Sequence, residues 1–185
     1  FLILLCEMGP NEGIGFDPAY DETRIEHEAK KQITFYQDFY GEKYADVVGD
    51  FVCCKMTLEH IPDTADFLRT IRHSIGDNRE TSIFFQIPNA GYVMQNVAFW
   101  DVYYEHCSYF TEASLTYLFL NTGFDVLNVF TDYDDQYLMI EAQPSLSIEE
   151  LPKVVNSLLL TAVKEQVKRF ASTVPTRLEK WQEFL

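Results

Sequence analysis

The sequence predicts an α/β fold with a mostly parallel sheet, an antiparallel C-terminal hairpin and a helical extension after it. Three observations carry this prediction. Strand-like and helix-like segments alternate through residues 1–123, which is typical of parallel strands joined by helices. Two strand-like runs then follow each other directly within 124–143, around a polar turn. Beyond Pro144 the apolar residues change to helical spacing.

Residues 1–39 predict two helices and two strands. Residues 1–8 resemble the end of a helix, stopped by the Gly-Pro pair that follows. Residues 12–17 predict a short buried strand that ends at Asp17, because the next residue is a proline. Residues 21–32 place acids early and lysines late, the order that a helix dipole favours, and 33–39 predict a second strand.

The middle of the chain continues the alternation. Residues 45–56 are almost continuously apolar, which predicts a central strand covered on both faces. Residues 62–76 predict a helix closed by glycine, and 81–88 predict another buried strand. A helix over 111–123 starts at a threonine cap, and 124–143 complete the sheet as a hairpin.

The last forty or so residues have a different pattern. Ser147 to Glu150 form a capping-box signature, and apolar residues at helical spacing follow over 151–170. Pro175 is predicted to interrupt this helix, because proline lacks the amide hydrogen that a helix interior needs. Residues 176–185 then resume as a second short helix.

These elements predict two parts, a core over 1–145 and a C-terminal helical extension over 146–185. The apolar side of the 147–170 helix needs a cover, which the core, a second copy of the chain or a further domain could supply. The chain begins at Phe1 without a methionine, inside a helix, so we expect it to be a fragment of a longer protein.

Composition restricts the partners. With 185 residues, 47% of them hydrophobic and 15% aromatic, the chain can bury a sizeable core. Its formal net charge is −15 and no basic cluster is present, which argues against nucleic acid or an anionic membrane surface as the main partner. A small-molecule substrate is still compatible with this net charge, since a local pocket can differ in charge from the whole chain.

The cysteines indicate the compartment. Cys6, Cys53, Cys54 and Cys107 show none of the usual zinc spacings, so we expect no metal site from them. Two of them are neighbours inside an apolar run, which indicates buried free thiols in a reducing compartment. We therefore expect a cytoplasmic protein.

Several motifs, in order, resemble the class I S-adenosylmethionine-dependent methyltransferases, whose sheet is Rossmann-like. They are GIGFDPAY at 13–20, YQDF at 36–39 and CCKMTLEHIPD at 53–63. The resemblance implies that Asp17 binds both ribose hydroxyls of the cofactor, a task that suits a carboxylate. It also places Asp38 at the adenine amino group, with Phe39 as a wall for the ring. Cys54 and Lys55 would approach the cofactor through their backbone atoms.

A narrower resemblance comes from YYEHCSYFTEASL at 103–115, which is similar to a segment of C-methyltransferases that act on nucleotide-linked deoxysugars. In that group the Tyr, Glu and His face the substrate, and the His is the proposed base. The residues implied here are Tyr103, Glu105 and His106. His106 would take a proton from the acceptor, Tyr103 would donate to a developing enolate oxygen, and Glu105 would orient the imidazole or hold a sugar hydroxyl.

One part of the family pattern is missing. The glycine-rich loop between the first strand and the first helix has no counterpart, because Phe1 falls inside that helix. Such a loop lets backbone amides approach the ligand closely. We therefore expect this chain alone to bind the cofactor weakly and to be inactive as a fragment.

Other interpretations remain open. A methyltransferase-like core that had lost its cofactor would act as an interaction module, docking through the C-terminal helix. An acidic strand end also serves NAD-dependent oxidoreductases, but the terminal hairpin and the LEHI segment at 58–61 argue against that class. Glu59 and His60 are interpreted as bracing the end of a strand rather than as catalytic. The residues upstream of the Tyr-Glu-His segment that would line a substrate pocket or pack in the core are Tyr92, Asn96, Phe99 and Trp100.

Overall fold

The computed structural model describes residues 1–24, 26–146 and 157–183. Its contacts divide the chain into two compact units, Phe1–Asp46 and Val47–Leu185. The division falls inside the predicted core. The predicted boundary between 145 and 146 adjoins the residues outside the description and stays a prediction.

The first unit contains one parallel pair of strands and one helix. Helix α1 (Leu2–Glu7) packs against β1 (Gly13–Phe16), which pairs in parallel with β2 (Ile33–Tyr36). Gly15 is required at this contact, because a Cβ there would lie 2.7 Å from the ring of Phe35. The predicted helix stop and both predicted strands are confirmed.

The connection between these strands differs from the prediction of one α-helix over 21–32. It forms two short 3₁₀ segments, η1 (Glu22–Arg24) and η2 (Glu28–Gln32). Ala29 is the one buried residue among these two segments, so little apolar surface is available to stabilise a longer helix. His27 caps η2, since its Nδ1 accepts the Ala29 amide hydrogen at 3.1 Å.

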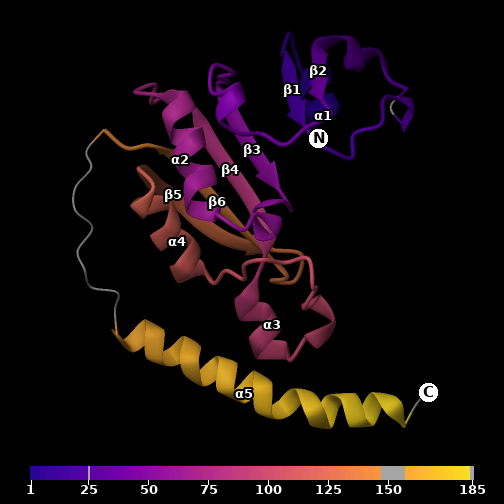
Figure 1. Cartoon of the computed structure of the whole chain (residues 1–185), viewed down its shortest axis with the longest axis vertical. Helices are drawn as coiled ribbons and strands as arrows, with labels where there is room; N and C mark the ends of the chain where they lie inside the picture. The colour runs from indigo at the N-terminus through magenta and orange to yellow at the C-terminus, as the bar shows by residue number, and fades with distance from the viewer. Residues whose placement is uncertain (25, 147–156, 184–185) are drawn as a thin grey trace. The chain divides into compact units, whose positions relative to one another are not determined.

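The second unit is built on a four-stranded sheet in the order β3-β4-β6-β5 (Figure 1). Strands β3 (Phe51–Lys55) and β4 (Ser82–Pro88) are parallel. Strands β5 (Phe124–Asp132) and β6 (Tyr137–Pro144) form the predicted hairpin, and β6 also pairs antiparallel with β4. The α/β class is therefore confirmed, with two parallel and two antiparallel pairings among the described strands.

The prediction that residues 45–56 form a central strand is wrong for this sheet. Strand β3 lies at its edge, and Phe51 is 43% exposed. A continuous apolar run shows that both faces of a strand are apolar, but it does not show how many strands flank it.

Helices α2 (Thr64–Ile75) and α4 (Glu112–Asn121) begin and end where the sequence predicts. Gly76 ends α2 with a φ of 61°, and α4 packs against β5 and β6. Phe119 of α4 contacts Phe85 and Phe124 at ring-centroid distances of 5.2 and 5.6 Å, which places the aromatic core between helix and sheet. Arg72 ties α2 to this core by donating to the carbonyl oxygens of Gly123 and Ser145, each at 2.8 Å.

The start of α4 gives a stability prediction. Thr111 and Ser114 form a reciprocal capping box, in which each side chain accepts the other's backbone amide hydrogen. Thr111→Ala should therefore lower the free energy of unfolding by about 1 kcal/mol, measured by urea denaturation. Thr116→Ala, inside the same helix, is the matched control and should not destabilise the protein; equal losses in both variants would contradict the capping role.

Two shorter helical elements follow β4 and were not predicted. Helix α3 (Ala90–Asn96) is capped by the side chain of Asn89, and η5 (Phe99–Asp101) comes after it. Helix α3 and η5 lie beyond the end of the sheet, and the chain comes back to the sheet at α4 (Figure 1). The segment between η5 and α4 holds the Tyr-Glu-His motif.

The C-terminal helix α5 (Ser157–Gln182) is one helix that contains Pro175. The prediction of an interruption at Pro175 with a second helix after it is therefore wrong. Most of α5 is exposed, so water can satisfy the carbonyl oxygen that the proline leaves without a donor. The predicted capping box at 147–150 lies outside the described residues. Among the described residues, no helix combines the length and the apolar character that crossing a membrane requires.

Candidate functional site

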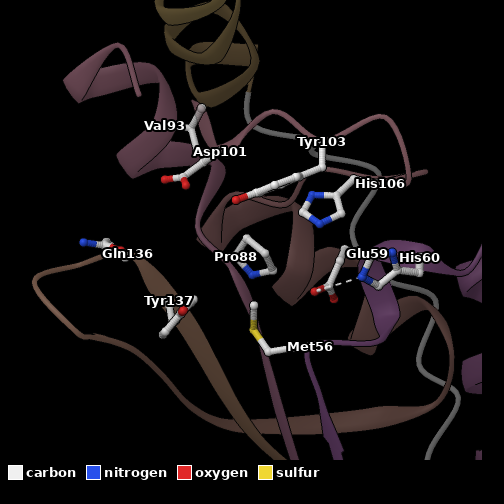
Figure 2. A pocket seen from close by; sticks show the side chains of 10 residues that line it. All are labelled: Met56, Glu59, His60, Pro88, Val93, Asp101, Tyr103, His106, Gln136 and Tyr137. Atoms are coloured by element: carbon white, nitrogen blue, oxygen red, sulfur yellow. Dashed lines mark ion pairs between the residues drawn. The ribbon is translucent and has the colours of Figure 1, made fainter. Parts of the chain in front are cut away.

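A cavity of about 260 Å³ lies beside the carboxyl ends of β3 and β4, where open α/β sheets bind their ligands (Figure 2). We call it the histidine cavity. Its walls come from the residue after β3, the last residue of β4, η4 (Leu58–His60), α3 and the segment after it, and the hairpin turn with the start of β6. The lining residues are Met56, Glu59, His60, Pro88, Val93, Asp101, Tyr103, His106, Gln136 and Tyr137.

Met56 enters the cavity because the chain turns sharply at the end of β3. Its φ is 50°, a left-handed value that is uncommon for a residue with a side chain. Its amide still donates to the Gln86 carbonyl oxygen at 2.8 Å, so β4 holds the turn in place. Such conformations are frequent at functional sites.

Glu59 is the most buried of the polar residues in the cavity wall, at 2% exposure. Its carbonyl oxygen accepts the amide hydrogens of Cys107 and Ser108, at 2.7 and 3.2 Å, which fixes the Tyr-Glu-His segment against η4. Its two carboxylate oxygens have no hydrogen-bond partner among the described residues. Burial raises the pKa of this carboxyl group. The backbone of Glu59 thus holds the Tyr-Glu-His segment, and its side chain is part of the cavity wall. The predicted bracing of the strand end stays a prediction.

His106 lies over Glu59 and His60 in Figure 2. Its ring contacts those of His60, Tyr103 and Tyr109 at centroid distances of 4.9, 5.1 and 5.5 Å. Its Nδ1 is buried and has no hydrogen-bond partner among the described residues. Burial, followed by the charge of His60, lowers the pKa of His106, and the carboxylates of Glu105 and Asp101 oppose this shift. The neutral, proton-accepting form of the imidazole is therefore favoured.

The other two residues of the predicted triad have different surroundings. Tyr103 lines the cavity, and its backbone both donates to and accepts from the hydroxyl of Tyr109, at 3.0 and 3.1 Å. Glu105 is exposed and is not part of the cavity wall; its side chain bonds the hydroxyl of Tyr104, whose pKa it raises. The Glu105 carbonyl oxygen lies 3.4 Å from Nδ1 of His60. The structure therefore brings Tyr103 and His106 together at the cavity, but not the Glu105 carboxylate.

Glu59, His60 and His106 each place a nitrogen or oxygen atom within 4.8 Å of the other two. Ligand atoms of one tetrahedral ion, at bond lengths near 2.0–2.1 Å, would lie only about 3.4 Å apart. The distance between His60 Nε2 and Glu59 Oε1 is 3.9 Å. The cluster as described is thus wider than a formed metal site, and we assign no metal to it.

The residues predicted to hold the adenosine part of the cofactor lie in the first unit. Asp17 follows β1 directly and is exposed; its Oδ1 accepts the Ala19 amide hydrogen at 2.8 Å. Asp38 is engaged more fully, because Lys43 and the Tyr44 hydroxyl both donate to its Oδ2. These bonds, that of Lys43 above all, lower the pKa of Asp38. Phe39 is 73% exposed beside it.

Cys54 and Lys55 lie at the carboxyl end of β3, in the second unit. They pair with Phe85 and Gln86 of β4. Burial raises the pKa of the Cys54 thiol to about 12, so the thiol stays neutral and unreactive at physiological pH.

The cavity wall includes none of the four residues predicted to line a pocket upstream of the motif, Tyr92, Asn96, Phe99 and Trp100. Phe99 and Trp100 contact Trp181 of α5 at centroid distances of 5.2 and 5.8 Å. Val93 and Asp101, their neighbours in sequence, face the cavity. Gln136 and Tyr137 also line the cavity and were not predicted to do so. Their position depends on the antiparallel pairing of β6 with β4, which brings the hairpin turn to the cavity.

Comparisons with solved structures agree on the fold. The chain is similar to N,N-8-amino-8-demethyl-D-riboflavin dimethyltransferase from Streptomyces davawensis, at 21% identity and a TM-score of 0.58, over 78% of this chain and 46% of that one. It is also similar to magnesium protoporphyrin IX methyltransferase from Synechocystis PCC 6803 with bound S-adenosylhomocysteine, at 16% identity and a TM-score of 0.54, over 78% and 68%. A 16S rRNA (adenine(1408)-N(1))-methyltransferase mutant from Catenulisporales acidiphilia matches at 16% identity and a TM-score of 0.53, over 78% of each chain.

The chain thus spans about half the length of the first of these proteins. A comparison with curated proteins gave no match. A family model described as a methyltransferase domain matches residues 1–129, which is more than half of the chain. The chain therefore belongs to the methyltransferase domain family, whose members use S-adenosylmethionine.

Proposed function

We propose that the protein transfers the methyl group of S-adenosylmethionine to a small polar acceptor bound in the histidine cavity, and that His106 is the base. One observation supports this most strongly: an imidazole whose pKa is lowered by burial is part of the wall of a cavity at the carboxyl ends of parallel strands. Family membership supplies the cofactor and the reaction class.

The residues of the first unit fit the cofactor at its ribose. Asp17 follows a parallel strand, is exposed, and uses Oδ1 for the Ala19 amide, so its carboxylate can accept further bonds from two vicinal hydroxyls. Asp38 would hold the adenine amino group with an oxygen that already accepts from Lys43 and Tyr44. When bound, the cofactor supplies an electrophilic methyl group on a sulfonium.

The chain's own residues would position the acceptor and move its proton. His106 takes the proton as the acceptor attacks, while Tyr103 offers a phenol hydroxyl to negative charge that develops on an oxygen. The apolar groups of Met56, Pro88 and Val93 in the cavity wall exclude water from this exchange. Alignment and water exclusion are the main contributions a protein makes to such a transfer.

For the acceptor we propose a nucleotide-linked sugar that is methylated at a carbon next to a carbonyl group. The order Tyr103, Glu105, His106 supports this, as does a cavity of about 260 Å³, which suits a group the size of one sugar ring. No lysine or arginine is among the described lining residues, so the phosphates of such an acceptor would lie outside the cavity. We further propose a cytoplasmic location, which four free cysteines support, and neither nucleic acid nor a membrane as partner.

The test is transfer of a labelled methyl group by the full-length protein to a panel of acceptors: nucleotide-linked keto sugars, the matching sugars without a keto group, and phenols. We expect product with the keto sugars, and cofactor-independent exchange of the proton next to the carbonyl in D₂O. Product with phenols alone would overturn the carbon acceptor. No transfer to any acceptor by a protein that binds the cofactor would overturn the proposed activity.

A further inference from the structure

Three buried side-chain atoms lack a hydrogen-bond partner among the described residues: both carboxylate oxygens of Glu59 and Nδ1 of His106. All three belong to the wall of the histidine cavity. Buried polar groups are almost always paired, and leaving one unpaired costs about 1–3 kcal/mol. That the exceptions lie together calls for an explanation.

The two groups are chemically complementary and close. An atom of each lies within 4.8 Å of the other, and Figure 2 shows the Glu59 carboxylate beneath the His106 ring. Nδ1 of a neutral imidazole can carry a hydrogen and donate it, and a carboxylate accepts such a bond well. A rotation of the His106 ring that brings Nδ1 to the carboxylate would pair two of the three atoms.

The neighbouring groups do not take this role. His60 Nε2 is 3.9 Å from Glu59 Oε1, which exceeds a hydrogen bond, and the His60 side chain is 45% exposed, so water can complete its bonding. Glu105, the carboxylate that the sequence motif nominates, is exposed and bonds Tyr104. Asp101 also lines the cavity, and its charge acts on the pKa of His106. Glu59 is the carboxylate that combines near-complete burial with the absence of a hydrogen-bond partner among the described residues.

We infer that Glu59 is the positioning residue of the base: its carboxylate accepts a hydrogen bond from Nδ1–H of His106. This bond fixes the tautomer that leaves the Nε2 lone pair for the acceptor. The role in catalysis rests on the proposed function. In the reaction the acceptor's bond to hydrogen breaks, and the proton goes to Nε2. The electron pair of that bond forms the new bond to the methyl carbon, while the electrons of the sulfur–carbon bond remain on sulfur.

The hydrogen bond can be tested without any substrate. ¹⁵N NMR of the full-length protein distinguishes Nδ1–H from Nε2–H, and His106→Asn identifies the signals of His106. We expect Nδ1–H in the wild type and a shift to Nε2–H in Glu59→Leu, which removes the acceptor. Glu105→Gln should keep the wild-type tautomer. Nε2–H in the wild type, or an unchanged tautomer in Glu59→Leu, would overturn the inference.

A stability measurement separates this role from a structural one. Glu59→Leu removes the acceptor of this hydrogen bond, but it also removes the cost of burying a carboxylate, so the midpoint of thermal unfolding should change little. A fall together with an unchanged tautomer would mean that Glu59 only supports the fold. Should the leucine variant not fold, Glu59→Gln decides: kcat should drop by roughly 10²- to 10⁴-fold with little change in KM, and an unchanged kcat overturns the inference.

These outcomes are distinguishable from failure of the proposed function. If the NMR results are as expected but no acceptor is methylated, the Glu59–His106 pair stands and the assigned reaction fails. If methyl transfer occurs and depends on His106 but not on Glu59, the reaction stands and the pair fails.

Discussion

His106→Asn should lower the rate of methyl transfer by roughly 10²- to 10⁴-fold, the usual contribution of a positioned general base. Asparagine keeps part of the shape of the imidazole but cannot accept the acceptor's proton near neutral pH. The measurement is kcat with labelled cofactor and the acceptor found in the panel. His73→Asn is the matched control, because His73 is exposed in the last turn of α2, and it should keep full activity.

The same base makes a prediction about pH. The pKa of His106 lies below its ordinary value, first because of burial and then because of His60. A base must be unprotonated, so kcat/KM should stay high below pH 6.5 and fall only as the pH drops through the lowered pKa. The titratable groups that face His106 are Glu59 and His60 of η4, Asp101 of η5, and Tyr103, Glu105 and Tyr109 of its own segment. Loss of activity already above pH 6.5 would contradict this assignment.

Asp17→Asn should weaken cofactor binding by about 10- to 100-fold, because hydrogen bonds to a charged group contribute about 1.5–3 kcal/mol each. The amide keeps an oxygen that can accept the Ala19 amide hydrogen, so the turn after β1 is retained. Its NH₂ group cannot accept a hydroxyl hydrogen, so one of the two ribose bonds is lost.

Calorimetry with S-adenosylhomocysteine and the full-length protein measures this effect. Asp21→Asn is the control, since Asp21 makes a similar local bond to the Thr23 amide, at 2.9 Å, and has no assigned contact with the cofactor. Equal affinities for Asp17→Asn and the wild type would remove Asp17 from the ribose site.

The sequence predicts most of the described elements because their signals are local. The caps of α2 and α4, the stop after α1 and the hairpin of β5 and β6 depend on residues a few positions apart. Helix α3 has only seven residues and a weak apolar pattern, so its local signal is too small. The continuity of α5 through Pro175 depends on the exposure of the helix, which a single sequence does not contain.

Part of the candidate site was also predictable, because some of its residues belong to a local sequence motif. His106 and Tyr103 belong to one short motif, and the structure places both at the cavity. Glu59 lies 47 residues upstream of His106, and its side chain becomes unusual only through tertiary burial. The motif therefore predicts that Glu105, the sequence neighbour of His106, orients the imidazole, whereas in the structure Glu59 is the buried carboxylate near it.

The most direct test is a crystal structure of the full-length protein with S-adenosylhomocysteine and the methyl acceptor. We predict that the acceptor occupies the histidine cavity, with its reacting atom within hydrogen-bond distance of His106 Nε2 and the cofactor's ribose hydroxyls on Asp17. An acceptor bound away from His106, or a cofactor that does not contact Asp17, would contradict the account.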